Sequence, residues 1–248
     1  RYALKIPAVN KWNYRKYCDQ TRWNAARRYL RGNGIEIGAG NKPLEVPQGC
    51  NVTYVDHKSM YAFVQEFPEQ ADLTYVNIDV LDDGAVLGSF EDASLDFVIA
   101  NHVIEHTADP ISALFNWLRV LRQGGVLYMA VPDKRRTFDC VREVTPLDHL
   151  IQDHKSGPET SLRSDVTDYL LKVHCVPEAD IDSVVDQYIS ENREVHYHVW
   201  TSMDMMELLV YCRKTLGFAF DSELAQQTAN ECVFVLRKCV DGVSGVDS

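Results

Sequence analysis

The chain has 248 residues, which suits one large domain or two small ones and is enough to bury a sizeable hydrophobic core. Its 25 lysine and arginine residues stand against 36 aspartate and glutamate residues, which gives a formal net charge of −11. This charge argues against nucleic acid or an anionic membrane as a bulk electrostatic partner, although a local basic patch remains compatible with it.

The cysteines and the hydropathy pattern bear on the cellular compartment. Seven cysteines are scattered along the chain without a C-x-x-C pair, which predicts free thiols in a reducing compartment. No apolar run reaches the length of about 20 residues that a membrane span needs, and no secretory signal is visible. We therefore expect a cytoplasmic protein without a membrane span. The chain starts at Arg1, which predicts that it is part of something longer.

In chain order, a helical pattern over residues 11–31 is followed by short apolar runs that alternate with helical patterns. These runs are rich in valine, isoleucine and tyrosine, and they predict strands at 34–38, 52–56, 73–79, 95–100 and 126–131. The clearest helical pattern, 110–122, begins at a proline and is stopped by two glycines. The alternation predicts an α/β fold with a doubly wound, Rossmann-like, mostly parallel sheet.

The pattern changes after the fifth predicted strand. Between residues 133 and 200 only helical patches are found, which predicts a helical insertion that serves as a lid or substrate region. A further helix is expected over 201–216. Strands at 218–220 and 232–237, joined by the polar stretch 223–230, then predict an antiparallel terminal pair, and the tail 241–248 is expected to be disordered. We expect one domain over 1–248 that contains the insertion 133–200.

The stretch GIEIGAGNKP, residues 34–43, places Gly38 and Gly40 where the first strand turns into a loop. A dinucleotide fingerprint needs a third glycine and backbone N–H donors aimed at a pyrophosphate. Pro43 stands there instead and removes one donor. The loop therefore departs from the pattern of a nicotinamide cofactor site, and a lone G-x-G also fits a simple tight turn.

Acidic residues accumulate at the carboxyl ends of the predicted strands. Glu36 lies in the first strand, Asp56 ends the second and Asp79 ends the third. Carboxylates at one sheet edge disfavour a pyrophosphate but suit a cofactor that carries a sulfonium cation and an ammonium group. The alternative is that the two aspartates only cap the ends of their strands.

Together with these residues, the stretch SLDFVIANHVIEHTADPISALFNWLRVLRQGGVLYMAVP (94–132) resembles the class I S-adenosylmethionine-dependent methyltransferases. The resemblance covers residues 34–132 and implies S-adenosylmethionine as cofactor and S-adenosylhomocysteine as product. It implies that the glycine loop lies under the methionine part, that Asp56 takes the ribose hydroxyls, and that Asp79 frames the adenine. The implied cofactor-binding residues are Glu36, Gly38, Ala39, Gly40, Asp56, His57, Asp79, Val80 and Asn101.

Two histidines are candidate catalytic residues. Methyl transfer to a hydroxyl group calls for a general base, and His102 directly follows the fourth predicted strand. His198, in VHYHVW, ends the predicted insertion. As a base, either side chain has to be neutral, with a pKa near the histidine reference of about 6.5. A histidine at either position can also be an ordinary core or surface residue.

His102, Glu105 and His106 have ligand-type spacing on one helical turn. This spacing is similar to the Glu-x-x-Glu-His metal motif of small-RNA 2′-O-methyltransferases, with a histidine in place of the first glutamate. Three ligands on one turn still need a fourth group, such as His198. The same VIEH segment also occurs in members of the wider family that use no metal, so the metal requirement stays open.

The acceptor is the least defined part of the prediction. The negative charge and the insertion favour a compact acceptor, and VPDKRRTFD (131–139) resembles methyltransferases of bacterial polysaccharide pathways. We expect O-methylation of a small-molecule or sugar hydroxyl, with a natural-product or quinone hydroxyl as the alternative. A non-catalytic S-adenosylmethionine-binding module and a nicotinamide-dependent oxidoreductase are the alternatives from other classes. The oligomeric state stays open.

Overall fold

The computed structural model describes residues 11–59, 62 and 72–239, and its centre is one seven-stranded sheet in the order β3-β2-β1-β4-β5-β7-β6. The parallel strands are β1 (Asn33–Ile37), β2 (Asn51–Asp56), β3 (Val80–Leu81), β4 (Leu95–Asn101) and β5 (Leu121–Pro132). β7 (Glu231–Lys238) pairs antiparallel with β5, and β6 (Phe220–Gln227) pairs antiparallel with β7. The predicted fold class, including the antiparallel terminal pair, is confirmed.

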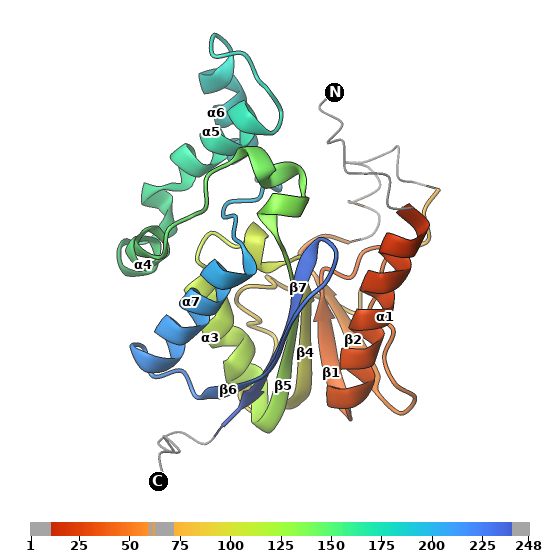
Figure 1. Ribbon diagram of the computed structural model, residues 1–248. Coiled ribbons are helices and arrows are strands. Elements are labelled where there is room, and N and C mark those ends of the chain that lie inside the picture. Colours follow the sequence, from red (N-terminus) through yellow and green to blue (C-terminus); the bar gives the residue numbers. More distant parts are fainter. Residues whose placement is uncertain (1–10, 60–61, 63–71, 240–248) are drawn as a thin grey trace.

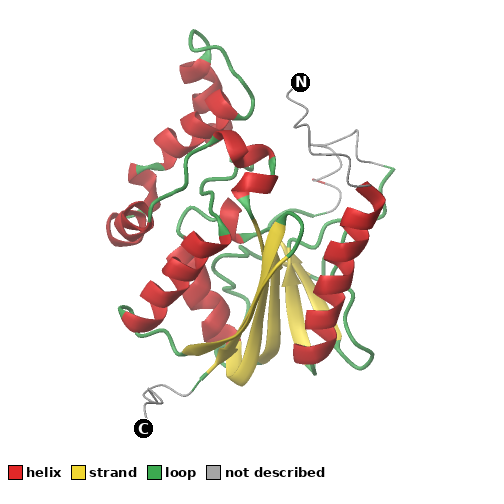
Figure 2. Cartoon of the chain, viewed as in Figure 1, coloured by secondary structure: helices red, strands yellow, loops and turns green. Residues whose placement is uncertain are grey.

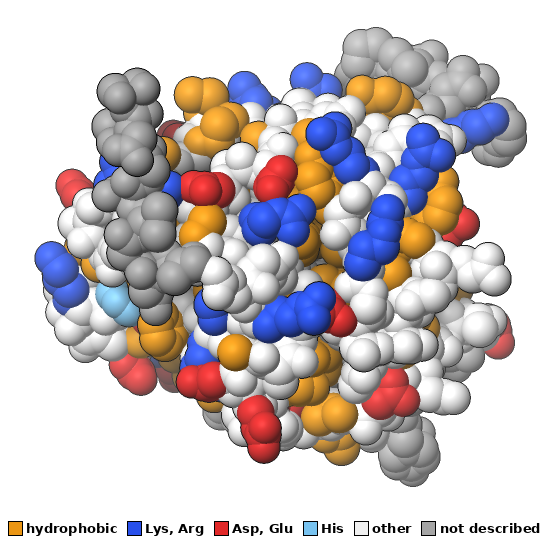
Figure 3. Space-filling model, turned by 90° about the horizontal axis from the view of Figure 1, so that it is seen from below, with side chains coloured by type: hydrophobic (Ala, Val, Ile, Leu, Met, Phe, Trp, Pro, Cys, Tyr) orange, Lys and Arg blue, Asp and Glu red, His pale blue; other side chains and the backbone are white. Residues whose placement is uncertain are grey.

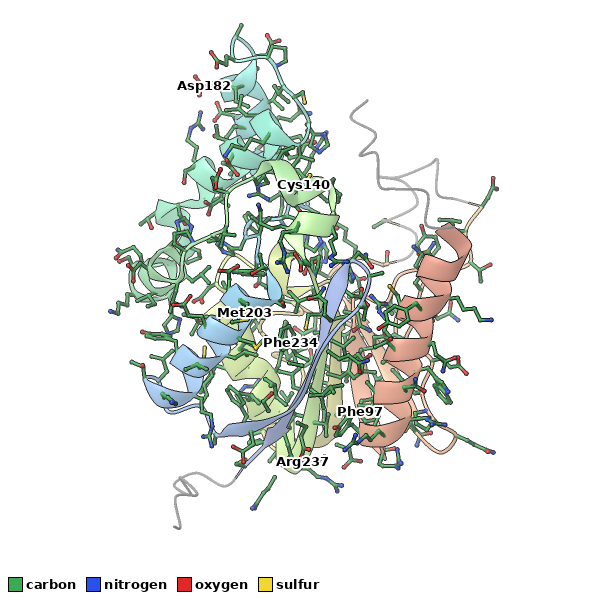
Figure 4. All side chains as sticks on the ribbon, viewed as in Figure 1. Phe97, Cys140, Asp182, Met203, Phe234 and Arg237 are labelled. Carbon is green, nitrogen blue, oxygen red and sulfur yellow. The ribbon has the colours of Figure 1, made fainter. Side chains whose placement is uncertain are left out.

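Helices cover both faces of the sheet, which explains why its central strands are largely apolar (Figure 1). Alternate residues of β4 enter two separate cores: Phe97 packs on the side of α1 (Lys11–Tyr29), and Val98 packs with residues of α3 (Pro110–Val120) and α7 (Ser202–Lys214). Phe234 of β7 belongs to the same core as Val98, and Figure 4 labels both Phe234 and Phe97.

The sequence signals that start α3 are seen directly. Asp109 is the N-cap and accepts a hydrogen bond from the Ser112 backbone N–H at 2.9 Å, and Pro110 follows as the first helical residue. The two glycines, however, predict the end of this helix too far along the chain. The helix ends at Val120, and Leu121 already pairs with Leu95 in the sheet.

Two strand predictions at the sheet edges are wrong. Residues 73–79 are irregular, and the strand is the two-residue β3 that follows them. The Asp79 carboxylate accepts the Tyr54 N–H of β2 at 2.8 Å, which takes a donor that a longer β3 would use. The polar stretch taken for a connection lies largely within β6, whose residues are mostly exposed because it is the edge strand. Its backbone bonds to β7 hold it in place without an apolar pattern.

Residues 133–200 stand over the carboxyl ends of the parallel strands (Figures 1 and 2). This helical segment contains α4 (Leu147–Ser156), α5 (Leu162–Lys172) and α6 (Ile181–Ser190), with short 3-10 turns at Lys134–Arg136, Phe138–Val141 and Pro158–Thr160. It has a small core of its own, formed by Val166, Leu170, Val185 and Val195. Figure 4 shows Asp182 at its far tip and Cys140 nearer to the sheet.

The outer surface is of mixed character at the opposite end of the sheet. Seen from below, lysine and arginine side chains are interspersed with hydrophobic and acidic ones (Figure 3). The helices within the described part of the chain are all too short or too polar to cross a bilayer.

Candidate functional site

A cavity of about 1470 Å³ opens at the carboxyl edge of the parallel strands. Ligands of doubly wound folds bind at this edge. Its wall combines the glycine loop, the ends of β2 and β4, the middle of α1, the start of β7 and the end of the helical segment. The lining residues discussed below are Arg22, Glu36, Gly38, Ala39, Gly40, Asp56, His57, Asp82, Asp83, Asn101, His102, His106, Asn192, Arg193, Glu194, Tyr197 and Glu231.

The glycine loop leaves β1 in a conformation that favours glycine. Gly38 and Gly40 have φ angles of +62° and +55°, in the left-handed region. The Gly38 N–H donates to the Val55 carbonyl at 2.9 Å, which keeps the turn tight against β2. Beyond Gly40 the chain stays irregular through Val46 and does not enter a helix, as the proline at position 43 leads one to expect.

Glu36 lies beneath this loop and is 1% exposed. Burial raises the pKa of its carboxyl to about 7, although the Leu44 N–H, 2.9 and 3.1 Å from its two oxygens, works in the opposite direction. The Asn101 amide also lowers this pKa, yet its own nitrogen and oxygen find no hydrogen-bond partner among the described residues and are buried. An amide in that state at a cavity wall is a ready contact for a bound ligand.

Asp56 and His57 connect β2 to the helical segment. His57 Nδ1 lies 3.2 Å from Asp56 Oδ1, and His57 Nε2 lies 3.6 Å from a carboxylate oxygen of Glu194. The hydrogen bond to Asp56 raises the pKa of His57 more than burial lowers it. The expected ribose ligand Asp56 thus faces the cavity beside a residue from the opposite wall.

Asp79 and Val80 lie outside the lining of the cavity, unlike the other implied cofactor residues. The carboxylate of Asp79 is occupied by the Tyr54 N–H. Asp82 and Asp83, which directly follow β3, line the cavity in this region. The signal for them in the sequence is the DVLDDG stretch, where two further acids follow Asp79.

His102 is held between two buried carboxylates. Its Nε2 lies 2.7 Å from Glu231 Oε2 and its Nδ1 lies 3.5 Å from Glu105 Oε1. Burial lowers the pKa of the imidazole, but the two carboxylates outweigh it and raise the pKa to about 9. His102 is therefore a cation at neutral pH. The neutral state that a general base needs, expected from the sequence, does not fit this environment.

Glu231 also forms an ion pair with Arg22. The Arg22 guanidinium of α1 donates to both of its oxygens, at 2.7 and 2.6 Å. Burial raises the pKa of Glu231, yet His102 and Arg22 together lower it to about 2. The ion pair joins three elements that are far apart in sequence: α1, the end of β4 and the start of β7.

The second candidate base, His198, lies away from the cavity. It is 1% exposed, its Nε2 contacts the Ala108 carbonyl at 3.2 Å, and burial lowers its pKa to about 4. It is neutral, but it does not line the cavity. The structure also separates it from His102, Glu105 and His106, whose metal site it was expected to complete.

A different group forms beside His102. Glu105, His106 and His196 bring one ligand atom each to within 4.8 Å of one another. His106 Nδ1 lies 2.9 Å from the Val195 carbonyl, and His196 Nδ1 lies 2.7 Å from Asp139 Oδ2, which leaves both Nε2 atoms for other partners. Burial lowers the pKa of His106 and keeps it neutral. The sequence does not predict that His106 and His196 lie together, because most of the helical segment separates them along the chain.

The basic stretch after β5, Lys134–Arg136, does not line the cavity. Arg135 forms an ion pair with Asp133, and Arg136 donates to the Ala229 carbonyl at 3.1 Å. These residues are therefore not among the cations that line the cavity. Arg22 and Arg193 line the cavity instead.

Comparison with known proteins gives one family match. The family model described as "Methyltransferase domain" matches residues 32–129, which hold β1, the glycine loop, β4, His102 and α3. No curated protein matches the sequence of this chain.

Solved structures share the fold. The chain is similar to the putative methyltransferase in complex with the Haloferax volcanii Trm112 methyltransferase activator, with 14% identity, 93% and 92% of the two chains covered, and a TM-score of 0.51. It is also similar to a putative Zn-dependent alcohol dehydrogenase from Rhodobacter sphaeroides, with 18% identity, 90% of each chain covered, and a TM-score of 0.53. At these identities the likeness concerns the fold alone.

The ion pair at Glu231 yields a test. In Glu231→Gln, we expect the pKa of His102 to fall below about 9, as followed by NMR titration of its ring protons, because one of its two carboxylates is neutralised. Removing one partner of a buried pair typically costs about 3–5 kcal/mol in the free energy of unfolding. Glu223→Gln, which removes the partner of Arg237 at the surface, is the matched control and should change neither.

The ion pair between His102 and Glu231 also makes the free energy of unfolding depend on pH. Because the folded-state pKa of His102 lies above its unfolded value, its stabilising contribution is full below about pH 6.5 and is lost as the pH rises through about 9. The free energy of unfolding, measured with denaturant, should fall over this window and fall less in Glu231→Gln. Equal pH profiles for the two proteins would contradict the ion pair.

Proposed function

We propose that this chain, whose residues 32–129 match the family model described as "Methyltransferase domain", transfers the methyl group of S-adenosylmethionine to a hydroxyl oxygen of a small molecule or sugar. The observation that carries the proposal is a single cavity that joins the glycine loop, Asp56 and Asn101 to a neutral histidine, His106. The family match supports the methyl donor, and the geometry of the cavity supports the kind of acceptor.

The residues present fit this cofactor. Gly38 and Gly40 carry no side chains, so the loop backbone is open to a ligand at these two positions. The amide of Asn101, which has no hydrogen-bond partner among the described residues, offers both a donor and an acceptor at the cavity wall. Asp56 ends β2 with a carboxylate that suits two vicinal hydroxyls, and the acids Asp82 and Asp83 lie further along the same edge. When bound, the cofactor supplies a methyl group on a positively charged sulfur. A surrounding of carboxylates stabilises such a cation.

His106 is the group that this site offers for proton transfer. Its Nδ1 is held by the Val195 carbonyl, so Nε2 carries the lone pair that accepts the proton of an acceptor hydroxyl. The imidazolium that results lies beside the buried carboxylate of Glu105, which stabilises its charge. His102, already a cation, stays in its ion pair and orients the neighbouring backbone.

The helical segment supports a compact acceptor. Its residues 192–194 and Tyr197 close one wall of the cavity, and the Tyr197 N–H donates to the Glu105 carbonyl at 2.9 Å. We propose that residues 133–200 act as the lid and acceptor platform. The net charge of −11 supports a small molecule or glycan over nucleic acid. All seven cysteines are free, which supports a place in the reducing cytoplasm.

A metal-assisted route is the second candidate, because Glu105, His106 and His196 also have the spacing of a three-ligand metal site. Three protein ligands and one open position are typical of catalytic zinc. Here the ion would polarise the acceptor oxygen, and His106 would serve as a ligand rather than as a base.

The cofactor assignment is tested by calorimetry with S-adenosylhomocysteine. Asp56→Ala should weaken binding by about 1.5–3 kcal/mol, the scale of a hydrogen bond to a charged group. Glu91→Ala, an exposed acid outside the cavity, is the control and should bind like the wild type. Unchanged affinity in Asp56→Ala, or tight binding of NAD, would overturn the assignment.

The two catalytic routes have different signatures in turnover with labelled S-adenosylmethionine and a panel of sugars, nucleotide sugars and phenols. If His106 is the base, His106→Ala should lower kcat by about 10²–10⁴-fold and leave S-adenosylhomocysteine affinity intact. The wild-type rate should then rise with pH through an apparent pKa below about 6.5, because burial lowers the pKa of His106.

Chelation separates the routes. Loss of activity in EDTA, with recovery on adding a divalent ion and a matching loss in His196→Ala, assigns the site to a metal instead of a base. His174→Ala, an exposed histidine on the helical segment, is the control for both arms. Full turnover in His106→Ala with EDTA present would exclude both roles.

A further inference from the structure

A second cluster of ligand-type side chains lies inside the helical segment, away from the cavity. It consists of His149 and Asp153 of α4, Asp165 of α5 and His198 just before α7. One ligand atom from each of the four lies within 4.8 Å of the other three. We propose that these four residues bind one divalent transition metal ion, of the zinc type, and that this ion fixes the helical segment over the cavity.

The spacing of the ligand atoms suits a tetrahedral ion. His149 Nε2 lies 3.1 Å from Asp153 Oδ2 and 3.4 Å from Asp165 Oδ1. Zinc binds histidine nitrogen and carboxylate oxygen at about 2.0–2.2 Å, which puts neighbouring ligands of a tetrahedron roughly 3.4 Å apart. His149 and Asp153 are one helical turn apart on α4, so they face the same side.

Two of the ligand atoms have no hydrogen-bond partner outside the cluster among the described residues. Asp153 and His198 are each 1% exposed. Asp153 Oδ2 and His198 Nδ1 are buried and form no hydrogen bond within the described part of the chain, and the ion-pair contact of Asp153 Oδ2 is with His149, itself a proposed ligand. Buried polar atoms are nearly always satisfied in folded proteins, so both atoms point to a bound group.

The outer contacts hold the ligands in orientation. His198 Nε2 lies 3.2 Å from the Ala108 carbonyl, so its N–H donates there and the lone pair of Nδ1 is directed to the cluster. Asp153 Oδ1 accepts the hydroxyl of Ser161 at 2.6 Å, which leaves Oδ2 for the ion. Metal-binding histidines and carboxylates are typically supported in this way by a backbone carbonyl or a side chain.

The ligand set indicates the kind of ion and its role. Two imidazole nitrogens with two carboxylate oxygens suit zinc and neighbouring divalent transition metals better than magnesium or calcium, which prefer oxygen alone. Four protein ligands close the coordination shell, which is typical of structural sites. The two carboxylates also balance the charge of a divalent ion.

The ion would join three parts of the chain. It connects α4 and α5 to the stretch before α7, and Tyr197, next to His198, lines the cavity and donates to the Glu105 carbonyl. Loss of the metal should therefore loosen the cavity wall. This inference does not depend on the identity of the methyl acceptor.

The test uses the full chain, stripped of metal with a chelator and titrated with Zn²⁺ in a calorimeter and with Co²⁺ in a spectrophotometer. To silence the group at Glu105, His106 and His196, the titrations are run in a His196→Gln background. We expect one ion per chain, the intense visible absorption of tetrahedral Co²⁺, and a Tm that rises with Zn²⁺.

Two variants keep the result interpretable if others fail to fold. Asp165→Asn replaces the more accessible carboxylate ligand and should abolish stoichiometric binding. Ser161→Ala leaves all four ligands in place and should weaken binding by about 10–100-fold, since it removes an outer contact. His174→Ala is the control and should bind like its parent.

A folded parent protein that takes up no Zn²⁺ or Co²⁺ would overturn the proposal and leave a hydrogen-bonded cluster in which His149 contacts Asp165. Unchanged affinity in Asp165→Asn would also overturn it.

Discussion

One buried carboxylate, that of Glu231, organises the end of the sheet where the site lies. It accepts two hydrogen bonds from the Arg22 guanidinium and forms an ion pair with His102. A single side chain at the start of β7 therefore connects α1 to the end of β4. Removing one of these charged side chains would leave another charge unpaired in a low-dielectric environment, which is destabilising. Asn101, one residue before His102, is the last residue of β4 and pairs with Ala130 of β5.

The charges of the site fall into two regions. Acids at the ends of the strands, Glu36 and Asp56, surround the glycine loop, whereas the cations Arg22 and His102 lie toward α1 and β7. His106, which also lines the cavity, is neutral because burial lowers its pKa more than the neighbouring Glu105 raises it. The proposed cofactor carries a positive charge, which suits the acidic region, and the proposed acceptor hydroxyl would lose its proton to His106.

The sequence predicts the elements that depend on local chemistry and fails where distant contacts decide. β1, β4 and α3 are predicted because their apolar periodicity, the Asp109 cap and Pro110 are local signals. β6 is missed because an edge strand is held by backbone bonds to β7 and needs no apolar pattern. The charged state of His102 could not be predicted, because Glu231 lies far along the chain from it. His198 was placed beside the wrong histidines for the same reason, as its partner His149 lies in α4.

The claim that the cavity at the carboxyl edge holds S-adenosylmethionine is tested most directly by a crystal structure of the chain with S-adenosylhomocysteine. The account predicts the ribose hydroxyls at Asp56, the methionine part over Gly38–Gly40 within reach of the Asn101 amide, and the sulfur directed to the side of the cavity that His106 occupies. The product bound outside this cavity, or bound with its ribose away from Asp56, would contradict the account.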